Sequence, residues 1–161
     1  MSEKLLQKYY FLYLCSKNEK MKQIIVEVAW KNSAFDGTLI NELDYGTFRI
    51  IEHSFYDFSD MVQSCLDIEI NEWCEQNHEI PEWYEFKEYE FVYKFNDVAC
   101  MLKAYTSYIS LAAISRVTGI NQTLLSHYAN GLKFPRRKQR ERIIAGLRKI
   151  GEELKGAACA Y

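Results

Sequence analysis

The chain has 161 residues, of which 48% are apolar and 26% charged, and its formal net charge is −2. This length suits one domain of ordinary size or two small ones, with enough apolar residues for a core. Two prolines and seven glycines exclude collagen-like and low-complexity chains, and 24 aromatic residues argue against disorder.

The near-neutral total hides an uneven distribution of charge. Residues 1–105 contain 10 Lys and Arg against 19 Asp and Glu, a net charge of −9, whereas residues 106–161 contain 10 against 3, a net charge of +7. The acidic part also holds 20 of the 24 aromatic residues. An acidic, aromatic part followed by a basic part predicts two modules with different partners.

The cysteines and the amino-terminal residues bear on the compartment. The five cysteines lack the two-residue spacing of zinc or thioredoxin-like motifs, which favours free thiols in the cytoplasm. Residues 9–15 imitate a short signal peptide but lack a small-x-small cleavage site, and they are far shorter than the ~20 apolar residues that span a bilayer. We expect a cytoplasmic protein without a membrane partner. Residues 1–21 form an amino-terminal extension, either a short extra element or sequence upstream of a start at Met21.

Three strands are expected after this extension. Residues 22–30 are rich in β-branched side chains, and further strand patterns cover residues 38–43 and 47–51. The short connections between them predict an antiparallel meander. Its turns are expected at Asn32-Ser33, Asp36-Gly37 and Asp44-Tyr45-Gly46.

One helix and a fourth strand complete the acidic part. Asp57 is the expected helix cap, and Asp60 lies in the first turn, where the helix dipole favours negative charge. The apolar spacing continues to Trp73, and residues 78–81 should end the helix. Aromatic residues alternate over residues 89–95 and predict a strand. The β-β-β-α-β order predicts an α+β domain over residues 22–95.

The pattern is helical from residue 96 onward, which predicts an all-α domain over residues 96–161. A long amphipathic helix is expected after Pro135, with Gly146 and Gly151 interrupting it at ~1 kcal/mol each relative to alanine. Three shorter helices are expected before it, at about residues 98–105, 111–118 and 122–130.

The second and third of these helices have the features of a helix-turn-helix. Two helices that cross steeply through a three-residue turn need small residues where they cross. They also need a turn residue that tolerates positive φ, here Gly119. The small residues are Ala112, Ala113 and Ser115, and the expected shared core is Ile114, Ile120, Leu125 and Tyr128.

The outward face of the third helix is polar apart from one leucine and carries no acid, as a phosphate-lined groove requires. A basic run follows at Lys133, Arg136, Arg137, Lys138, Arg140 and Arg142. Phosphate contacts supply most of the affinity for DNA, and base edges supply sequence preference. We therefore predict a double-stranded operator as partner and a homodimer or higher homo-oligomer. The predicted DNA-binding residues are Gln122, Thr123, Leu124, Ser126, His127, Asn130, Lys133, Arg136, Arg137 and Lys138.

Residues 96–155 resemble the lambda-repressor-like (Cro/C1-type) helix-turn-helix family. In that resemblance Gln122 and Thr123 occupy the start of the recognition helix, and Asn130 falls where a phosphate contact is usual. Ser115 stands where the family commonly has alanine.

Together with the preceding domain, the chain resembles the HicB antitoxin family over most of residues 22–155. The resemblance implies a partial ribonuclease-H-like fold for the first domain and DNA binding for the second. It also implies a small basic mRNA-cleaving toxin of HicA type that the protein neutralises, and repression of their shared operon. An acidic domain would attract such a toxin. The matching segments are residues 24–30, Phe35-Asp-Gly-Thr through Glu42-Leu43, the helix from about Asp57, Glu79-Ile80-Pro81, and Ser115 to Leu154.

Three alternatives remain. The protein is a solitary regulator without a toxin, or a small-molecule sensor whose Trp30, Trp73, Trp83 and tyrosines line a pocket, although aromatics more often fill a core. The third is an Mg²⁺-dependent nuclease using Glu27, Asp36, Glu42 and Asp44, but no second acid is spaced to share a metal with Glu27. The three histidines are scattered as well. We expect no enzymatic activity, no metal and no cofactor.

Overall fold

The computed structural model describes residues 21–40 and 48–157 as a mixed α+β fold. Four strands form one sheet in the order β3-β2-β1-β4. The first three pair antiparallel, as the predicted meander requires, whereas β4 lies parallel to β1. The strands are β1 (Lys22–Lys31), β2 (Ala34–Ile40), β3 (Phe48–Glu52) and β4 (Tyr89–Phe95).

The turn between β1 and β2 is formed by Asn32 and Ser33, both with positive φ (50° and 62°), as predicted. The second predicted turn, at Asp36-Gly37, is wrong, because both residues lie inside β2. A Cβ on Gly37 would lie 2.5 Å from Cζ of Phe58, so this glycine admits an aromatic ring against the strand. The predicted turn at 44–46 and the predicted strand end at 41–43 lie outside the described residues.

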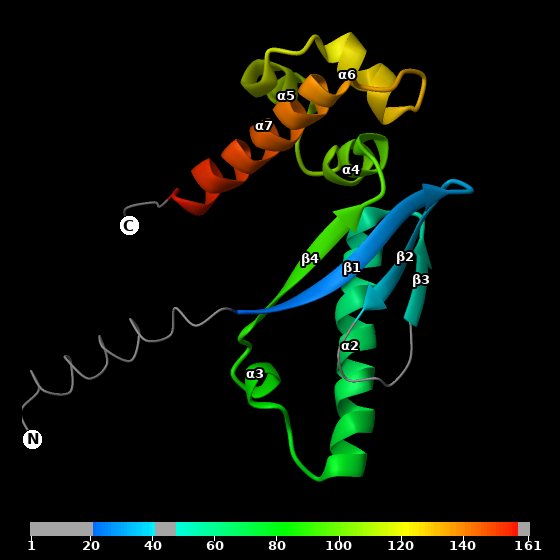
Figure 1. Cartoon of the computed structure of the whole chain (residues 1–161), viewed down its shortest axis with the longest axis vertical. Coiled ribbons are helices and arrows are strands. Elements are labelled where there is room, and N and C mark those ends of the chain that lie inside the picture. Colours follow the sequence, from blue (N-terminus) through cyan, green and yellow to red (C-terminus); the bar gives the residue numbers. More distant parts are fainter. Residues whose placement is uncertain (1–20, 41–47, 158–161) are drawn as a thin grey trace, which may run out of the picture.

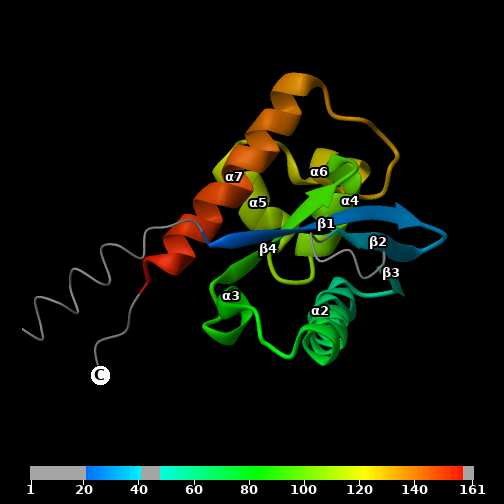
Figure 2. The ribbon, with the colours of Figure 1, turned by 60° about the horizontal axis from the view of Figure 1, so that its bottom comes forward.

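Helix α2 (Phe55–Asn77) packs across one face of the sheet (Figure 2). Its cap is Ser54 and not Asp57 as predicted, because the helix starts early enough to bury both Phe55 and Phe58. Ser54 Oγ accepts a 3.1 Å hydrogen bond from the Asp57 amide and donates one of 2.6 Å to its carboxylate. The helix ends at His78, in the left-handed conformation, within the predicted region. A single unpredicted turn, α3 (Glu82–Glu85), follows.

The first core lies between α2 and the sheet. It contains one acid, Glu69, whose side chain is fully buried, and neither of its carboxylate oxygens has a hydrogen-bond partner among the described residues. Burial raises the pKa of Glu69 to about 7, and the nearby Glu72 raises it further in the same direction. The largest apolar members are Ile24, Phe35, Leu39, Phe55, Phe58, Leu66 and Ile70.

Four helices gather at the end of the sheet where β4 ends (Figure 1). Their bounds follow the prediction closely, and the last one continues through Gly146 and Gly151. These helices are α4 (Val98–Tyr105), α5 (Leu111–Thr118), α6 (Gln122–Ala129) and α7 (Arg137–Lys155).

Helix α4 belongs to two cores at once. Its Cys100 and Ala104 pack into the core beneath the sheet, whereas its Val98 and Leu102 pack into a second core with α5, α6 and α7. This arrangement follows from the helical period, since residues two apart point to different sides of a helix. Lys103 also lies over the ring of Trp30, 4.5 Å from its centre, and ties α4 to β1.

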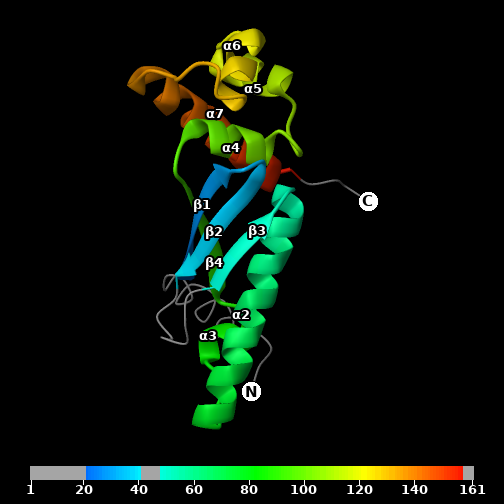
Figure 3. The same cartoon turned by 90° about the vertical axis from the view of Figure 1, so that its right-hand side faces the viewer.

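Charge is separated along the long axis of the molecule. The basic first turn of α7 lies near α6 at one end, while α3 and the carboxyl end of α2 lie at the other (Figures 1 and 3). Residues 67–90 of that far end contain nine acids and one lysine. None of the helices in the described part of the chain is long and apolar enough to cross a bilayer.

Candidate nucleic-acid interface

The connection between α5 and α6 is held by a set of local hydrogen bonds. Gly119 closes α5 at φ 63° and donates its amide to the Ser115 carbonyl at 2.8 Å. Asn121 opens α6 by accepting a 2.8 Å bond from the Thr123 amide, and Ser110 caps α5 in the same way. Thr118, buried between them, donates to Ile114 O and accepts from the Ile120 amide. These local hydrogen bonds therefore help to fix the turn.

The four residues predicted to share a core are all buried. Ile114 and Leu125 are fully enclosed, and Ile120 and Tyr128 are nearly so. The Tyr128 hydroxyl also donates a 2.6 Å hydrogen bond to Oε1 of Gln139, so α6 is held against α7 by a polar contact as well.

This packing leaves the predicted outward face of α6 accessible. Gln122, Thr123 and Asn130 are exposed, and Leu124, Ser126 and His127 are half-buried. The Asn130 amide bends back onto the helix and donates to Ser126 O at 2.9 Å. The face as a whole is polar, short and free of acidic side chains.

The predicted basic run divides into two groups. Lys133, Arg136, Lys138 and Arg140 are exposed and make no ion pair with a described residue. Arg137 instead pairs with Glu141 one turn later, N to O 2.9 Å. Arg142 donates a hydrogen bond to the main-chain oxygen of Thr118 at the end of α5, so its guanidinium is engaged within the fold.

The amino end of α7 is electrostatically unusual. It has no side-chain cap and no acid in its first turn, where Arg137 and Lys138 stand instead. The start of a helix carries a partial positive charge, and cations placed beside it add unfavourable repulsion. A bound anion offsets this positive charge. This end, close to the face of α6, is suited to a phosphate group.

The loop between α6 and α7 contains two exposed apolar residues outside the predicted DNA-binding set. Leu132 is 70% exposed and Phe134 is 82% exposed, although both are strongly apolar. The loop is anchored where the Leu132 amide donates to His127 O at 2.9 Å. The only sequence signal for them was two apolar residues amid cations.

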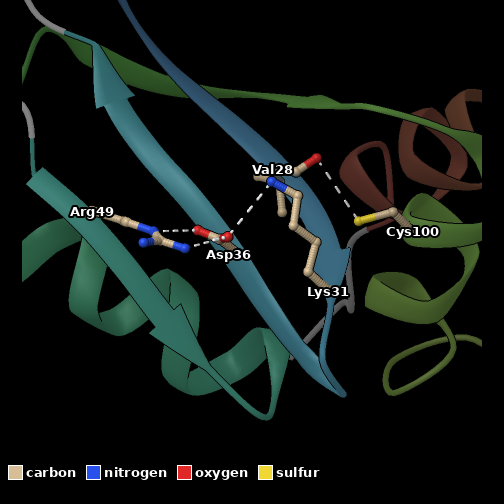
Figure 4. Close-up of polar contacts among 5 residues, drawn as sticks. All are labelled: Val28, Lys31, Asp36, Arg49 and Cys100. Carbon is tan, nitrogen blue, oxygen red and sulfur yellow. Dashed lines mark hydrogen bonds and ion pairs between the residues drawn. The ribbon is translucent and has the colours of Figure 1, made fainter.

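Of the acids considered for metal catalysis, Asp36 is paired with two cations. Asp36 accepts two hydrogen bonds from Arg49, of 2.9 and 2.8 Å, and lies 3.6 Å from Lys31 Nζ (Figure 4). The Arg49 hydrogen bonds hold the pKa of Asp36 below its usual value. Glu42 and Asp44 lie outside the described residues. Within residues 21–40 and 48–157, no three His, Cys, Asp or Glu side chains cluster closely enough to hold a metal ion.

Two of the three tryptophans considered for a sensor pocket, Trp30 and Trp83, contact other aromatic rings. Trp30 makes an edge contact with Phe35, and Trp83 makes edge contacts with Tyr84 and Tyr89. Both side chains pack against the first core.

Comparisons with known proteins give no relative. No protein-family model matches the sequence, and neither the curated proteins nor the solved structures contain a match. The resemblance to the HicB antitoxins therefore rests on the residues quoted above.

Proposed function

We propose that the protein is a sequence-specific DNA-binding repressor of the antitoxin type, in which α5 and α6 form a helix-turn-helix. The observation that supports this most directly is the acid-free polar face of α6 beside the uncapped, basic start of α7. A protein surface that carries polar side chains on one helix and uncompensated cations around it matches the demands of a DNA groove between two phosphate backbones.

The two groups of residues take different roles in this proposal. Gln122 and Thr123, exposed in the first turn of α6, reach base edges in the major groove, where an amide side chain pairs well with adenine. Lys133, Arg136, Lys138 and Arg140 contact phosphates and set affinity without sequence preference. The start of α7 binds one further phosphate through its free amides.

The antitoxin part of the proposal is supported by the acidic end of the molecule. Exposed Met61 and Ile68 lie two turns apart on the outer face of α2, and Glu72 and Glu75 continue that exposed side. Two exposed apolar side chains followed by acids suit a small basic protein with an apolar contact of its own. The β-β-β-α-β order also agrees with the partial ribonuclease-H-like domain that the HicB resemblance implies. The runner-up function is a solitary regulator without a toxin.

The DNA-binding proposal is tested by selecting bound duplexes from a random pool with the full chain, then measuring affinity against salt concentration. Gln122→Ala should relax preference at one position by about 1–3 kcal/mol, whereas Arg136→Ala should weaken all sequences and reduce the salt slope by roughly one. Lys149→Ala, also on α7 but paired with Glu153, is the control and should bind as the wild type does. Failure to enrich any sequence would refute the proposal.

The antitoxin proposal is tested separately through the gene beside this one. If it encodes a short basic chain of about 60 residues, the two proteins should copurify, and Ile68→Glu should weaken the complex more than it weakens DNA binding. A neighbouring gene of another kind, with no basic protein retained by the chain, favours the solitary regulator. The oligomeric state is measured on the same samples by light scattering.

A further inference from the structure

A pocket of about 400 Å³ lies where the sheet meets the helical part of the molecule. Its walls come from three elements that are distant in the sequence, β4, α4 and α7. The lining residues are Tyr93 and Phe95 of β4, Met101 and Tyr105 of α4, Ile109 after α4, and Ile144, Leu147, Arg148 and Gly151 of α7.

The composition of the walls is that of a small-molecule site. Such sites in proteins measure roughly 300–1,000 Å³ and combine apolar and aromatic walls with a few polar groups. Here Met101, Ile109, Ile144 and Leu147 line the pocket and are only half-buried. The walls therefore retain apolar surface that the chain's own side chains leave uncovered in the described structure.

Gly151 of α7 is exposed and lines the pocket. A glycine inside a helix costs about 1 kcal/mol relative to alanine. A Cβ at this position would meet no atom within 4 Å, so the packing of the described chain does not demand glycine there. This is the opposite of Gly146, five residues earlier, where a Cβ would lie 2.5 Å from Cγ2 of Thr118.

The polar groups of the pocket point to an anion. Arg148 lines it one turn after Ile144, is exposed, and makes no ion pair or hydrogen bond with a described residue. Tyr93 and Tyr105 also line it, and neither hydroxyl has a hydrogen-bond partner in the described part of the chain. A guanidinium fork pairs best with a planar carboxylate, and phenols donate to the same group.

We propose that this pocket binds a small molecule with an aromatic body and a single carboxylate. The ring lies among Phe95, Met101 and Leu147, and the carboxylate pairs with Arg148 at the rim. Because the pocket joins β4 to the helix whose first turn carries the basic residues, the ligand also alters affinity for DNA, a step that rests on the proposed function.

The binding is tested on the full chain by calorimetry with 2-naphthoate and with the neutral 2-naphthamide. We expect one saturable site for each, tighter for the acid. Gly151→Met should fill the space and weaken both compounds at least roughly tenfold, while Gly151→Ala, the matched control, should bind both as the wild type does. Arg148→Gln should weaken 2-naphthoate roughly tenfold and leave 2-naphthamide unchanged. Lys149→Gln, its exposed neighbour, should change neither.

Several results would overturn the proposal. One is non-saturable binding, and another is binding that Gly151→Met leaves intact in a protein with an unchanged circular dichroism spectrum. Absence of binding to the wild type, combined with a dimer that Gly151→Met converts to monomer, would assign the pocket to a second copy of the chain. Saturating 2-naphthoate that leaves DNA affinity unchanged would overturn the regulatory step alone, and it would leave the proposed DNA binding standing.

Discussion

The guanidinium of Arg142 donates a hydrogen bond to the main-chain oxygen of Thr118, so one cation of the basic run closes the end of α5. Arg140, two residues earlier, is exposed and has no such partner among the described residues. Arg142→Gln should therefore lower the free energy of unfolding by about 1 kcal/mol, because it loses a hydrogen bond from a charged group. Arg140→Gln should leave stability unchanged and weaken DNA binding uniformly. Urea titration measures the change in stability, and a salt series of binding isotherms measures the change in DNA affinity. If Arg140→Gln destabilised the protein and Arg142→Gln only weakened DNA binding, the separation of the basic run into these two groups would be wrong.

The two glycines of α7 should respond in opposite ways to alanine. Gly146→Ala places a methyl group 2.5 Å from Cγ2 of Thr118, and the overpacking of about 1–3 kcal/mol exceeds the gain in helix propensity. Gly151→Ala meets nothing within 4 Å and should stabilise the protein by up to about 1 kcal/mol. Thermal and urea unfolding of the pair check the sign of each change. Equal effects would mean that α5 and α7 pack less closely than described.

The buried Glu69 should make stability depend on pH. Burial raises its pKa from the ordinary 4.5 to about 7, so the folded protein holds a proton that the unfolded chain releases between these two values. The contribution of Glu69 to the free energy of unfolding is therefore most favourable below pH 4.5. It declines by on the order of 3 kcal/mol as the pH rises to 7. Above pH 7 it is constant.

Glu69→Gln tests this dependence because it cannot ionise. The difference in unfolding free energy between variant and wild type should shift in favour of the variant from pH 4.5 to 7. Glu75→Gln, exposed on the same helix, is the control and should show no comparable shift. A flat difference for Glu69→Gln would show that its carboxyl group is solvated or paired in solution.

The start of α2 offers a test of the corrected cap. Ser54→Ala removes both the bond to the Asp57 amide and the bond to its carboxylate, and should cost about 1 kcal/mol. Asp57→Asn keeps the cap itself and should cost less. Denaturant midpoints of the two variants decide between Ser54 and Asp57; a larger loss for Asp57→Asn would restore the original prediction.

The sequence predicted the elements well where periodicity is strong. Residues 89–95 alternate aromatic and other side chains over a whole strand, and β4 has those bounds. The stretch from residue 111 to 129 combines a helical period with Gly119 and Asn121, two residues whose local chemistry ends and begins helices. In both cases the signal lies within the element itself.

The wrong predictions arise where a residue distant in the sequence determines the local structure. Asp36-Gly37 has turn chemistry, but Phe58 of α2 packs on Gly37, and that contact cannot be inferred from neighbouring residues. The partner of Arg142 lies 24 positions away, on another helix. The pocket among β4, α4 and α7 depends on the distance at which α7 passes the sheet, which no local pattern encodes.

Because α4 supplies residues to both cores, the chain has no position at which it can be divided without loss. A fragment that ends after β4 would lack Cys100 and Ala104 and leave the sheet core partly open, and a fragment that starts after α4 would lack Val98 and Leu102. The two halves should then melt in a single transition, and each should require the other during folding. Cleavage within α4 would thus remove residues from both cores at once, whereas loss of α5, α6 and α7 alone would leave Cys100 and Ala104 in the sheet core.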